Sequence, residues 1–320
     1  MDYYPLQEKE TFLSGDLMIE EYIVNYLNFC GKQKKLSSNT VRAYGLDLRQ
    51  FRKFIQGETI ITRRLIQSYV ESLNGTHKPS SVKRKLTVLK SFFHYAEEEY
   101  DWENPFLRFK FKIKEQKQLP RLVPAETIQD LLKTLYKQMT LVIPRSRKYA
   151  ELVRDAAVLE LLFATGLRVS ELCALSTSDI NIQAGDALVS GKGGKTRLVH
   201  VVNGDVIKIL REYADIFSAS IVKTGYFFIN RIGRPLSPDS VRSMIRRRAK
   251  EAEIPLHITP HMFRHSFATL LLEEGVDIRY IQHFLGHSSI LTTQIYTHVS
   301  TKKQRSILLS KHPRNNMRIP

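Results

Sequence analysis

The sequence predicts a mainly α-helical protein with a small antiparallel β-sheet, divided into two domains. Apolar residues recur at three-to-four spacing through most of the chain, which is the pattern of amphipathic helices. One strand–turn–strand pattern interrupts it, with apolar runs at 187–189 and 197–202 on either side of a glycine-rich turn. At 320 residues the chain is long for one domain and comfortable for two. We therefore expect a helical amino-terminal domain followed by a mixed α+β domain.

Four amphipathic helices are expected within residues 15–110. The first has its apolar residues at 19–29, and Ser37 is placed to cap the second. Thr62 can cap the third helix, and Pro79 opens the fourth. Four short helices with apolar inner faces make a compact helical domain.

The second domain, residues 123–300, is expected to combine further helices with the hairpin. Helical periodicity is clear at 128–135 and 153–164. The apolar run at 226–229 predicts an additional strand.

Three further segments flank these domains. Residues 1–14 form an amino-terminal extension. A basic run at 108–117, with Pro120 after it, predicts a linker at 111–122. Residues 301–320 form a basic tail, for which a disordered state is one expectation.

The charge of the chain is strongly positive and unevenly distributed. The formal net charge is +17, which indicates a polyanionic partner, most often nucleic acid, although solubility alone would also explain it. Residues 32–90 hold 14 basic and three acidic side chains, and an acidic stretch follows at 97–103. Some of the basic residues are expected to be ordinary solvated surface. Those predicted to meet DNA phosphates are Arg42, Arg49, Arg52, Lys53, Lys83, Arg84, Lys85 and Lys90.

The composition also argues against several classes of protein. Cys30 and Cys173 cannot form a disulfide framework and fit a reducing compartment. The sequence contains no run of about 18 apolar residues, so no membrane span is expected. The first residues lack the basic-then-apolar order of a signal peptide. We therefore expect a cytoplasmic protein.

Two clusters could bring a basic side chain to a phosphate. An apolar helix ends at Gly166 and a new one begins near Arg168, whose planar guanidinium suits two phosphate oxygens. Arg168 could equally pair with Glu171, three residues further on. In the glycine-rich turn, Lys192 could enter a DNA groove or donate a proton, and Lys195 is a second candidate. A lysine at such a turn is more often simply exposed.

Three later clusters carry histidines and a tyrosine. His261 and Arg264 share one helix face because they are three residues apart. His287 follows a helix that ends at Gly286, and Tyr296 lies on the next short helix. The histidines lack carboxylate or thiolate partners at regular spacing, and Arg264 would repel a cation. The pattern therefore predicts an anion site and no metal.

In their order and approximate spacing, these clusters resemble the tyrosine recombinases, also called the phage integrase family, and most closely the compact Xer-type branch. The motifs are ATGLRVSEL, GKGGKTR, TPHMFRHSFAT, LGHSS and TTQIYTHVS. The resemblance covers residues 15–300 and is strongest over 155–300. The connection at 137–150 departs from it, because it is longer than expected for a compact Xer-type protein, and we expect a loop on the DNA side or a protein contact there. It implies a four-helix, SAM-like core-binding domain and an α+β catalytic domain. The family's six active-site positions are filled here by Arg168, Lys192, His261, Arg264, His287 and Tyr296.

The resemblance also implies a chemistry that needs neither metal nor ATP, and no cofactor. Tyr296 would attack a DNA backbone phosphate and form a covalent 3′-phosphotyrosyl link, which conserves the phosphodiester energy for rejoining. Arg168 and Arg264 would bind the non-bridging oxygens. The two histidines would add hydrogen bonds there, and His261 could help to move the tyrosine proton. Lys192 would protonate the departing 5′-oxygen.

Double-stranded DNA is the expected partner. The family implies a homotetramer on two DNA sites, or a paired recombinase, and a carboxyl-terminal segment that docks on a neighbouring subunit. The reaction would be integration or excision of a mobile element, or Xer-like resolution. Two alternatives are a catalytically silent DNA-binding regulator of the same fold and a type IB topoisomerase-like enzyme.

Overall fold

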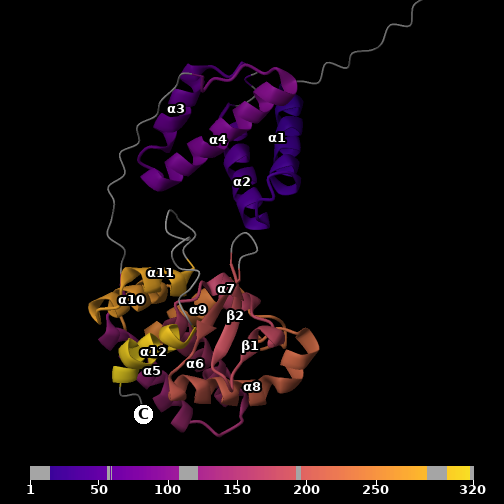
Figure 1. Cartoon of the computed structure of the whole chain (residues 1–320). Helices are drawn as coiled ribbons and strands as arrows, with labels where there is room; N and C mark the ends of the chain where they lie inside the picture. The colour runs from indigo at the N-terminus through magenta and orange to yellow at the C-terminus, as the bar shows by residue number, and fades with distance from the viewer. Residues whose placement is uncertain are drawn as a thin grey trace, which may run out of the picture. The chain divides into compact units, whose positions relative to one another are not determined.

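The computed structural model describes residues 15–55, 58, 60–107, 122–191, 196–286 and 301–317. The chain divides into two compact units, Met1–Gln118 and Leu119–Pro320 (Figure 1). Both are mainly helical, and strands occur in the second unit among the described residues, so the predicted fold class is confirmed. None of the helices in the described ranges is long and apolar enough to cross a membrane. The predicted linker at 111–122 lies almost wholly outside the described residues.

The four helices predicted for the first unit are present. Ser37 Oγ accepts a hydrogen bond from the Thr40 backbone N–H (3.2 Å), and Thr62 Oγ1 accepts one from Leu65 (3.3 Å), as expected of helix caps. Pro79 lies in the first turn of its helix. The helices are α1 (Gly15–Lys32), α2 (Ser38–Ile55), α3 (Arg63–Leu73) and α4 (Pro79–Tyr100).

Aromatic rings fill the interior of this unit. Phe92 and Phe93 of α4 are buried, and the ring of Tyr26 meets Phe92 edge to face at 5.6 Å. Tyr22 stacks on Tyr100 with ring centroids 4.0 Å apart. Large rings bury much apolar area per residue, so four short helices suffice for a stable core.

Lys85 was predicted to contact a DNA phosphate, and the structure contradicts this prediction. Its side chain is only 6 % exposed, and Nζ donates to Asp47 Oδ1 (2.8 Å) and to Gln50. Asp47 is itself buried and also pairs with Arg84. The charge of Lys85 is therefore neutralised inside the helical unit, and the residue holds α4 to α2 instead of meeting a phosphate.

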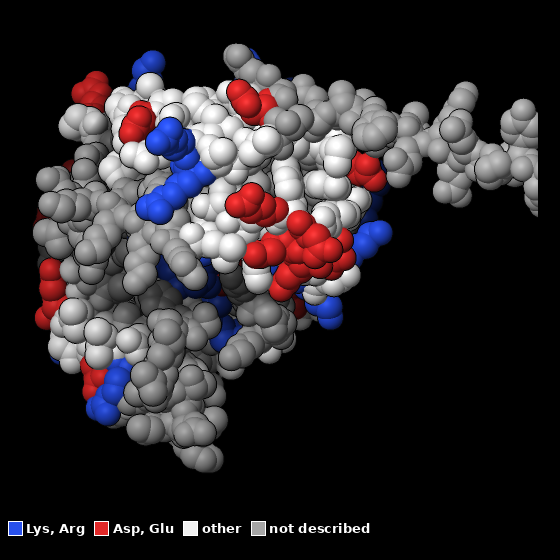
Figure 2. All heavy atoms as spheres, turned by 90° about the horizontal axis from the view of Figure 1, so that it is seen from above, with Lys and Arg blue, Asp and Glu red and all other residues white. Residues whose placement is uncertain are grey.

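Acidic residues gather at one end of the helical unit. The carboxyl end of α4 and the turn after it expose Glu98, Glu99, Asp101 and Glu103. Figure 2 views the molecule from above and shows a cluster of acidic side chains on that face, with only scattered basic ones. A surface of this charge repels a polyanion, so this end of the unit is unsuited to contact DNA.

The second unit is built around one buried helix, α6 (Arg147–Thr165), in which every residue from Leu152 to Thr165 is buried. A three-stranded antiparallel sheet lies in the same unit, with the order β1-β2-β3 and Ala187 opposite Val199. The predicted hairpin is β2–β3. The other elements are α5 (Ala125–Thr140), α7 (Val169–Ala174), η1 (Thr177–Asp179), β1 (Ile180–Asn181), β2 (Asp186–Ser190), β3 (Thr196–His200), α8 (Gly204–Thr224), α9 (Pro238–Glu251), α10 (Pro260–Glu273) and α11 (Ile278–Leu285).

Two local predictions for this unit are wrong. Residues 226–229 make only isolated bridges and no strand, because Tyr213 Oη satisfies their backbone by donating to Phe227 O (3.0 Å) and accepting from Ile229 N (2.8 Å). The connection at 137–150 is also shorter than expected, since α5 continues to Thr140 and α6 begins at Arg147.

The carboxyl-terminal segment packs on its own unit. It comprises α12 (Thr301–Lys311) and η3 (Pro313–Asn316). Arg314 is 1 % exposed and donates from Nε and Nη2 to the two carboxylate oxygens of Glu160 on α6 (2.8 and 2.9 Å). Docking of this segment on a neighbouring subunit stays a prediction.

Candidate active site

The junction between α6 and α7 places Arg168. α6 ends at Gly166, whose φ of +61° lies in the left-handed region. A Cβ there would stand 2.7 Å from the ring of Phe267 and 2.8 Å from Leu285, so only glycine fits. The chain then turns into α7 with Arg168 as its N-cap residue and 36 % of that side chain exposed. The predicted helix break is confirmed.

Glu171 holds Arg168 in place. Its carboxylate accepts from the Arg168 backbone N–H (2.9 Å) and from Nη1 (2.7 Å). Arg197 on β3 binds the same carboxylate through Nη1 and Nη2 (3.1 and 2.8 Å) and donates from Nε to Phe284 O (3.1 Å). Burial acts to raise the pKa of Glu171, but the hydrogen bonds from Arg197 and Arg168 outweigh it and the net pKa is lowered. The predicted Arg168–Glu171 pair therefore exists, and it orients the guanidinium.

Arg264 is more buried than Arg168 and Arg197, with 7 % of its surface exposed. From α10 it donates through Nη1 to the carbonyl oxygen of Gly166 (2.8 Å) and through Nη2 to that of Leu285 (2.6 Å). Both acceptors stand at helix carboxyl ends, where the helix dipole is negative. Burial and then the charge of Arg168 lower the pKa of Arg264 to about 10. It is still charged at neutral pH.

His261 lies in the first turn of α10, one turn before Arg264. Although the residue is exposed, partial removal of its ring from water lowers the pKa of His261, and the nearby charges of His265, Arg264, Arg242 and Arg168 lower it further. The imidazole is consequently neutral at pH 7, with one nitrogen able to donate and the other to accept. Several cations without an excess of carboxylates make a site suited to an anion.

Two residues of this arrangement were not predicted. Arg197 falls within the motif GKGGKTR, but only the fold reveals that it reaches Glu171 and the end of α11. Arg242 on α9 acts electrostatically on His261. Neither position has a local pattern that distinguishes it from an exposed arginine.

Arg168, His261 and Arg264, three of the six predicted active-site residues, thus come together. Lys192, His287 and Tyr296 lie outside the described residues, as does Lys195. Among residues that the structure does describe, no group of three or more histidine, cysteine, aspartate or glutamate side chains could hold a metal ion.

Comparison with known proteins identifies the family. Residues 126–303 match the phage integrase family, and residues 23–100 match the phage integrase N-terminal SAM-like domain. The chain belongs to the phage integrase family. The predicted resemblance is therefore confirmed, and by family the chain is a tyrosine recombinase.

Similar proteins agree with this assignment. A tyrosine recombinase of Agathobacter rectalis is 45 % identical over 301 residues, covering 93 % of this chain and 98 % of that protein. Tyrosine recombinase XerD of Staphylococcus saprophyticus is 38 % identical over 311 residues, covering 93 % and 99 %.

Solved structures agree in fold. XerH site-specific recombinase bound to difH has a TM-score of 0.69 at 21 % identity, with 96 % of this chain and 99 % of that one covered. A lambda integrase dimer bound to a core site has a TM-score of 0.66 at 19 % identity, with 84 % and 95 % covered.

Proposed function

We propose that this chain is a site-specific DNA recombinase that breaks and rejoins strands through a covalent 3′-phosphotyrosyl intermediate. The observation that carries the proposal is the convergence of Arg168, His261 and Arg264 at the ends of α6 and α11, with Glu171 fixing the first of them. Family membership supplies the reaction class.

The first half of the reaction is an attack on one phosphate. Tyr296 loses its proton and forms a bond to phosphorus, while the bond from phosphorus to the 5′-oxygen breaks. Arg168 and Arg264 hold the non-bridging oxygens, where negative charge increases in the transition state. Since Arg264 is anchored by two carbonyl groups, it is positioned before DNA arrives. Lys192 gives its proton to the departing 5′-oxygen.

The two histidines complete the site. His261, neutral because its ring is partly removed from water and has cationic neighbours, can donate to a phosphate oxygen or accept the tyrosine proton. His287 adds a second hydrogen bond. In the second half of the reaction the 5′-hydroxyl of another strand attacks phosphorus and releases Tyr296.

We propose a tetramer on two DNA sites as the active assembly. A related fold, lambda integrase, is known as a tetramer bound to a Holliday junction. The helical unit, residues 15–110, would grip the duplex backbone through exposed basic residues such as Arg42, Arg49 and Lys90. The protein would act in the cytoplasm, on nucleoid DNA. The relatives named XerD favour Xer-like resolution over integration of a mobile element.

A nicked duplex tests the proposal. Cleavage beside a nick releases a short 5′-hydroxyl fragment, so the covalent complex accumulates, and sequencing the trapped DNA defines the site. We expect a covalent complex on a limited set of sequences. Binding without a covalent complex would instead indicate a silent regulator, and plasmid relaxation without site preference would indicate a topoisomerase.

A further inference from the structure

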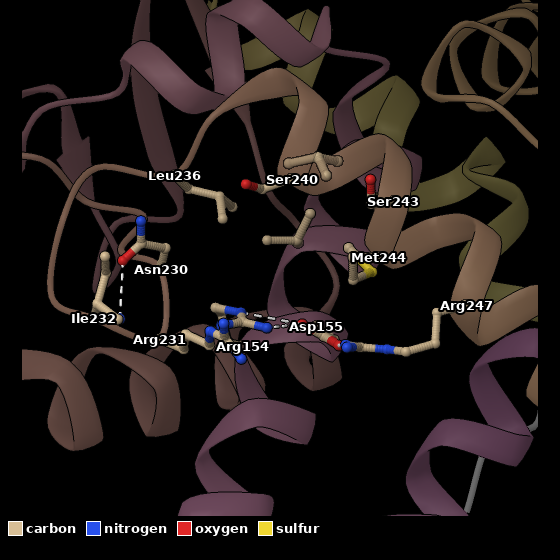
Figure 3. Close-up of a pocket in the computed structure, with 12 residues that line it drawn as sticks. Arg154, Asp155, Asn230, Arg231, Ile232, Leu236, Ser240, Ser243, Met244 and Arg247 are labelled. Carbon is tan, nitrogen blue, oxygen red and sulfur yellow. Dashed lines mark hydrogen bonds and ion pairs between the residues drawn. The ribbon is translucent and has the colours of Figure 1, made fainter.

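The catalytic unit contains a cavity that is lined by residues other than the candidate active-site residues. It has a volume of about 470 Å³, within the range of small-molecule sites. Its walls come from α6, from the loop 230–236 and from one face of α9 (Figure 3). Val158, Leu236, Val241 and Met244 are buried apolar residues in its lining.

One wall of this cavity carries an ionic cluster. Arg154 binds Asp155 Oδ1 through Nε (3.1 Å) and Nη2 (2.7 Å), and Arg247 reaches Asp155 Oδ2 (2.8 Å). Figure 3 shows the two arginines approaching Asp155 from opposite sides. Arg248, behind them, also binds Asp155 Oδ2. The only carboxylate in the lining is therefore fully used by cations.

Donors remain free to face the cavity. Arg154 has a side chain only 10 % exposed, and its Nη1 has no hydrogen-bond partner among the described residues. The guanidinium of Arg231, an exposed residue of the lining, likewise has no described ion pair. An N–H group that the protein leaves unused can donate to a bound acceptor.

We propose that this cavity binds a small organic phosphomonoester. Two guanidinium groups offer more donors than a carboxylate needs, whereas a phosphate presents three terminal oxygens with a charge near −2. The apolar residues beside them, Val158, Leu236, Val241 and Met244, would contact the ester's aromatic or aliphatic body. Arg247 is committed to Asp155 and Glu151, so it shapes the wall and does not bind the ligand directly.

Calorimetric titration of the full chain tests this proposal. The probes are phenyl phosphate and adenosine 5′-monophosphate, with inorganic phosphate and adenosine as references. We expect at least one of the two esters to bind at least tenfold more tightly than either reference, because both the phosphate donors and the apolar residues contribute. If neither ester binds more tightly than inorganic phosphate, the proposal is wrong.

Matched variants locate the binding. Arg231→Ala changes an exposed residue of the lining and should weaken ester binding at least tenfold. Arg234→Ala removes an exposed arginine of the same loop that does not line the cavity, and it should leave binding unchanged. An equal loss in both variants would contradict the proposal, since it would indicate general attraction to the loop.

DNA is the competing source of phosphate. A short duplex without a recombination site should not displace the bound ester, because the cavity accommodates the ester's apolar body as well as its phosphate. If the duplex displaces the ester and Arg231→Ala weakens duplex binding by the same factor, the cavity is a backbone contact and the proposal fails.

Discussion

Arg197 and Glu171 form a two-point ion pair, with Nη1–Oε1 and Nη2–Oε2 distances of 3.1 and 2.8 Å, that joins strand β3 to the short helix α7. Glu171 binds Arg168 through the same carboxylate. Because β3 pairs with β2 and Lys192 falls between these two strands in the sequence, this ion pair links the supports of two predicted active-site residues. Its integrity should therefore govern catalysis more than affinity.

Glu171→Gln tests that role. The amide keeps one acceptor oxygen but loses the charge that holds two arginines, so Arg168 is no longer fixed. We expect cleavage of a nicked duplex to slow by about 100-fold, the loss typical of a misplaced catalytic group. DNA affinity in a gel shift should change less than threefold, because a single site residue contributes little beside many phosphate contacts. A parallel fall in cleavage and affinity would contradict the positioning role.

Gly166→Ala should destabilise the catalytic unit strongly. The added methyl group meets Phe267 and Leu285 at 2.7 and 2.8 Å, and the residue keeps a left-handed backbone. Gly225→Ala is the matched control, since its φ of +73° is similar but nothing lies within 4 Å of its Cβ. We expect the free energy of unfolding, measured with urea, to fall by about 1 kcal/mol in the control and by about 3 kcal/mol or more in Gly166→Ala. Equal losses would mean that the packing around Gly166 is not tight.

Because His312 is buried, the free energy of unfolding should depend on pH. Its Nε2 donates to Ala164 O (3.1 Å) and its Nδ1 accepts from Arg314 N (3.0 Å), so the neutral ring is required. Burial above all lowers the pKa of His312 to about 4. An unfolded histidine has a pKa near 6.5, so the unfolded state binds an extra proton between about pH 4 and 6.5, and stability falls as the pH falls through that window.

The size of this loss of stability can be measured by comparing the wild type with His312→Gln. Between pH 7 and 5 the wild type should lose about 2 kcal/mol more than His312→Gln, which keeps a donor to Ala164 O but does not titrate. Urea unfolding at both pH values gives the difference. Identical pH profiles would show that His312 is not neutral and buried in solution.

Alanine variants of Lys85 and Lys90 should distinguish a lysine that stabilises the fold from one that contacts DNA. Lys90 is exposed on α4, so Lys90→Ala should reduce the slope of log affinity against log salt by about 1 without affecting folding. Lys85→Ala leaves Asp47 with one ion-pair partner fewer in the interior, so it should destabilise the helical unit while the folded protein keeps its salt slope. The reverse outcome would restore Lys85 to the DNA-binding set.

Local signals explain what could be predicted from the sequence. The cap at Thr62, the proline that opens α4, the break at Gly166 and the β2–β3 hairpin each depend on residues within a few positions of one another. The interactions that produce these features are local, so a single sequence is enough to predict them.

Long-range partners explain what could not be predicted. Lys85 meets Asp47 38 residues away, and Arg314 meets Glu160 154 residues away. Helical periodicity gives the face on which a side chain lies but not the element that covers it. The apolar run at 226–229 similarly lost its predicted strand to the hydroxyl of Tyr213, which no local pattern reveals.

The most direct test of the account is the identity of the residue that becomes linked to DNA. After trapping on a nicked duplex, nuclease and protease digestion followed by mass spectrometry should find the nucleotide adduct on Tyr296. Tyr296→Phe should give no covalent complex while its gel-shift affinity is unchanged, and Tyr280→Phe, a change on α11, should give a normal yield. A normal covalent yield from Tyr296→Phe, or an adduct on another residue, would contradict the account.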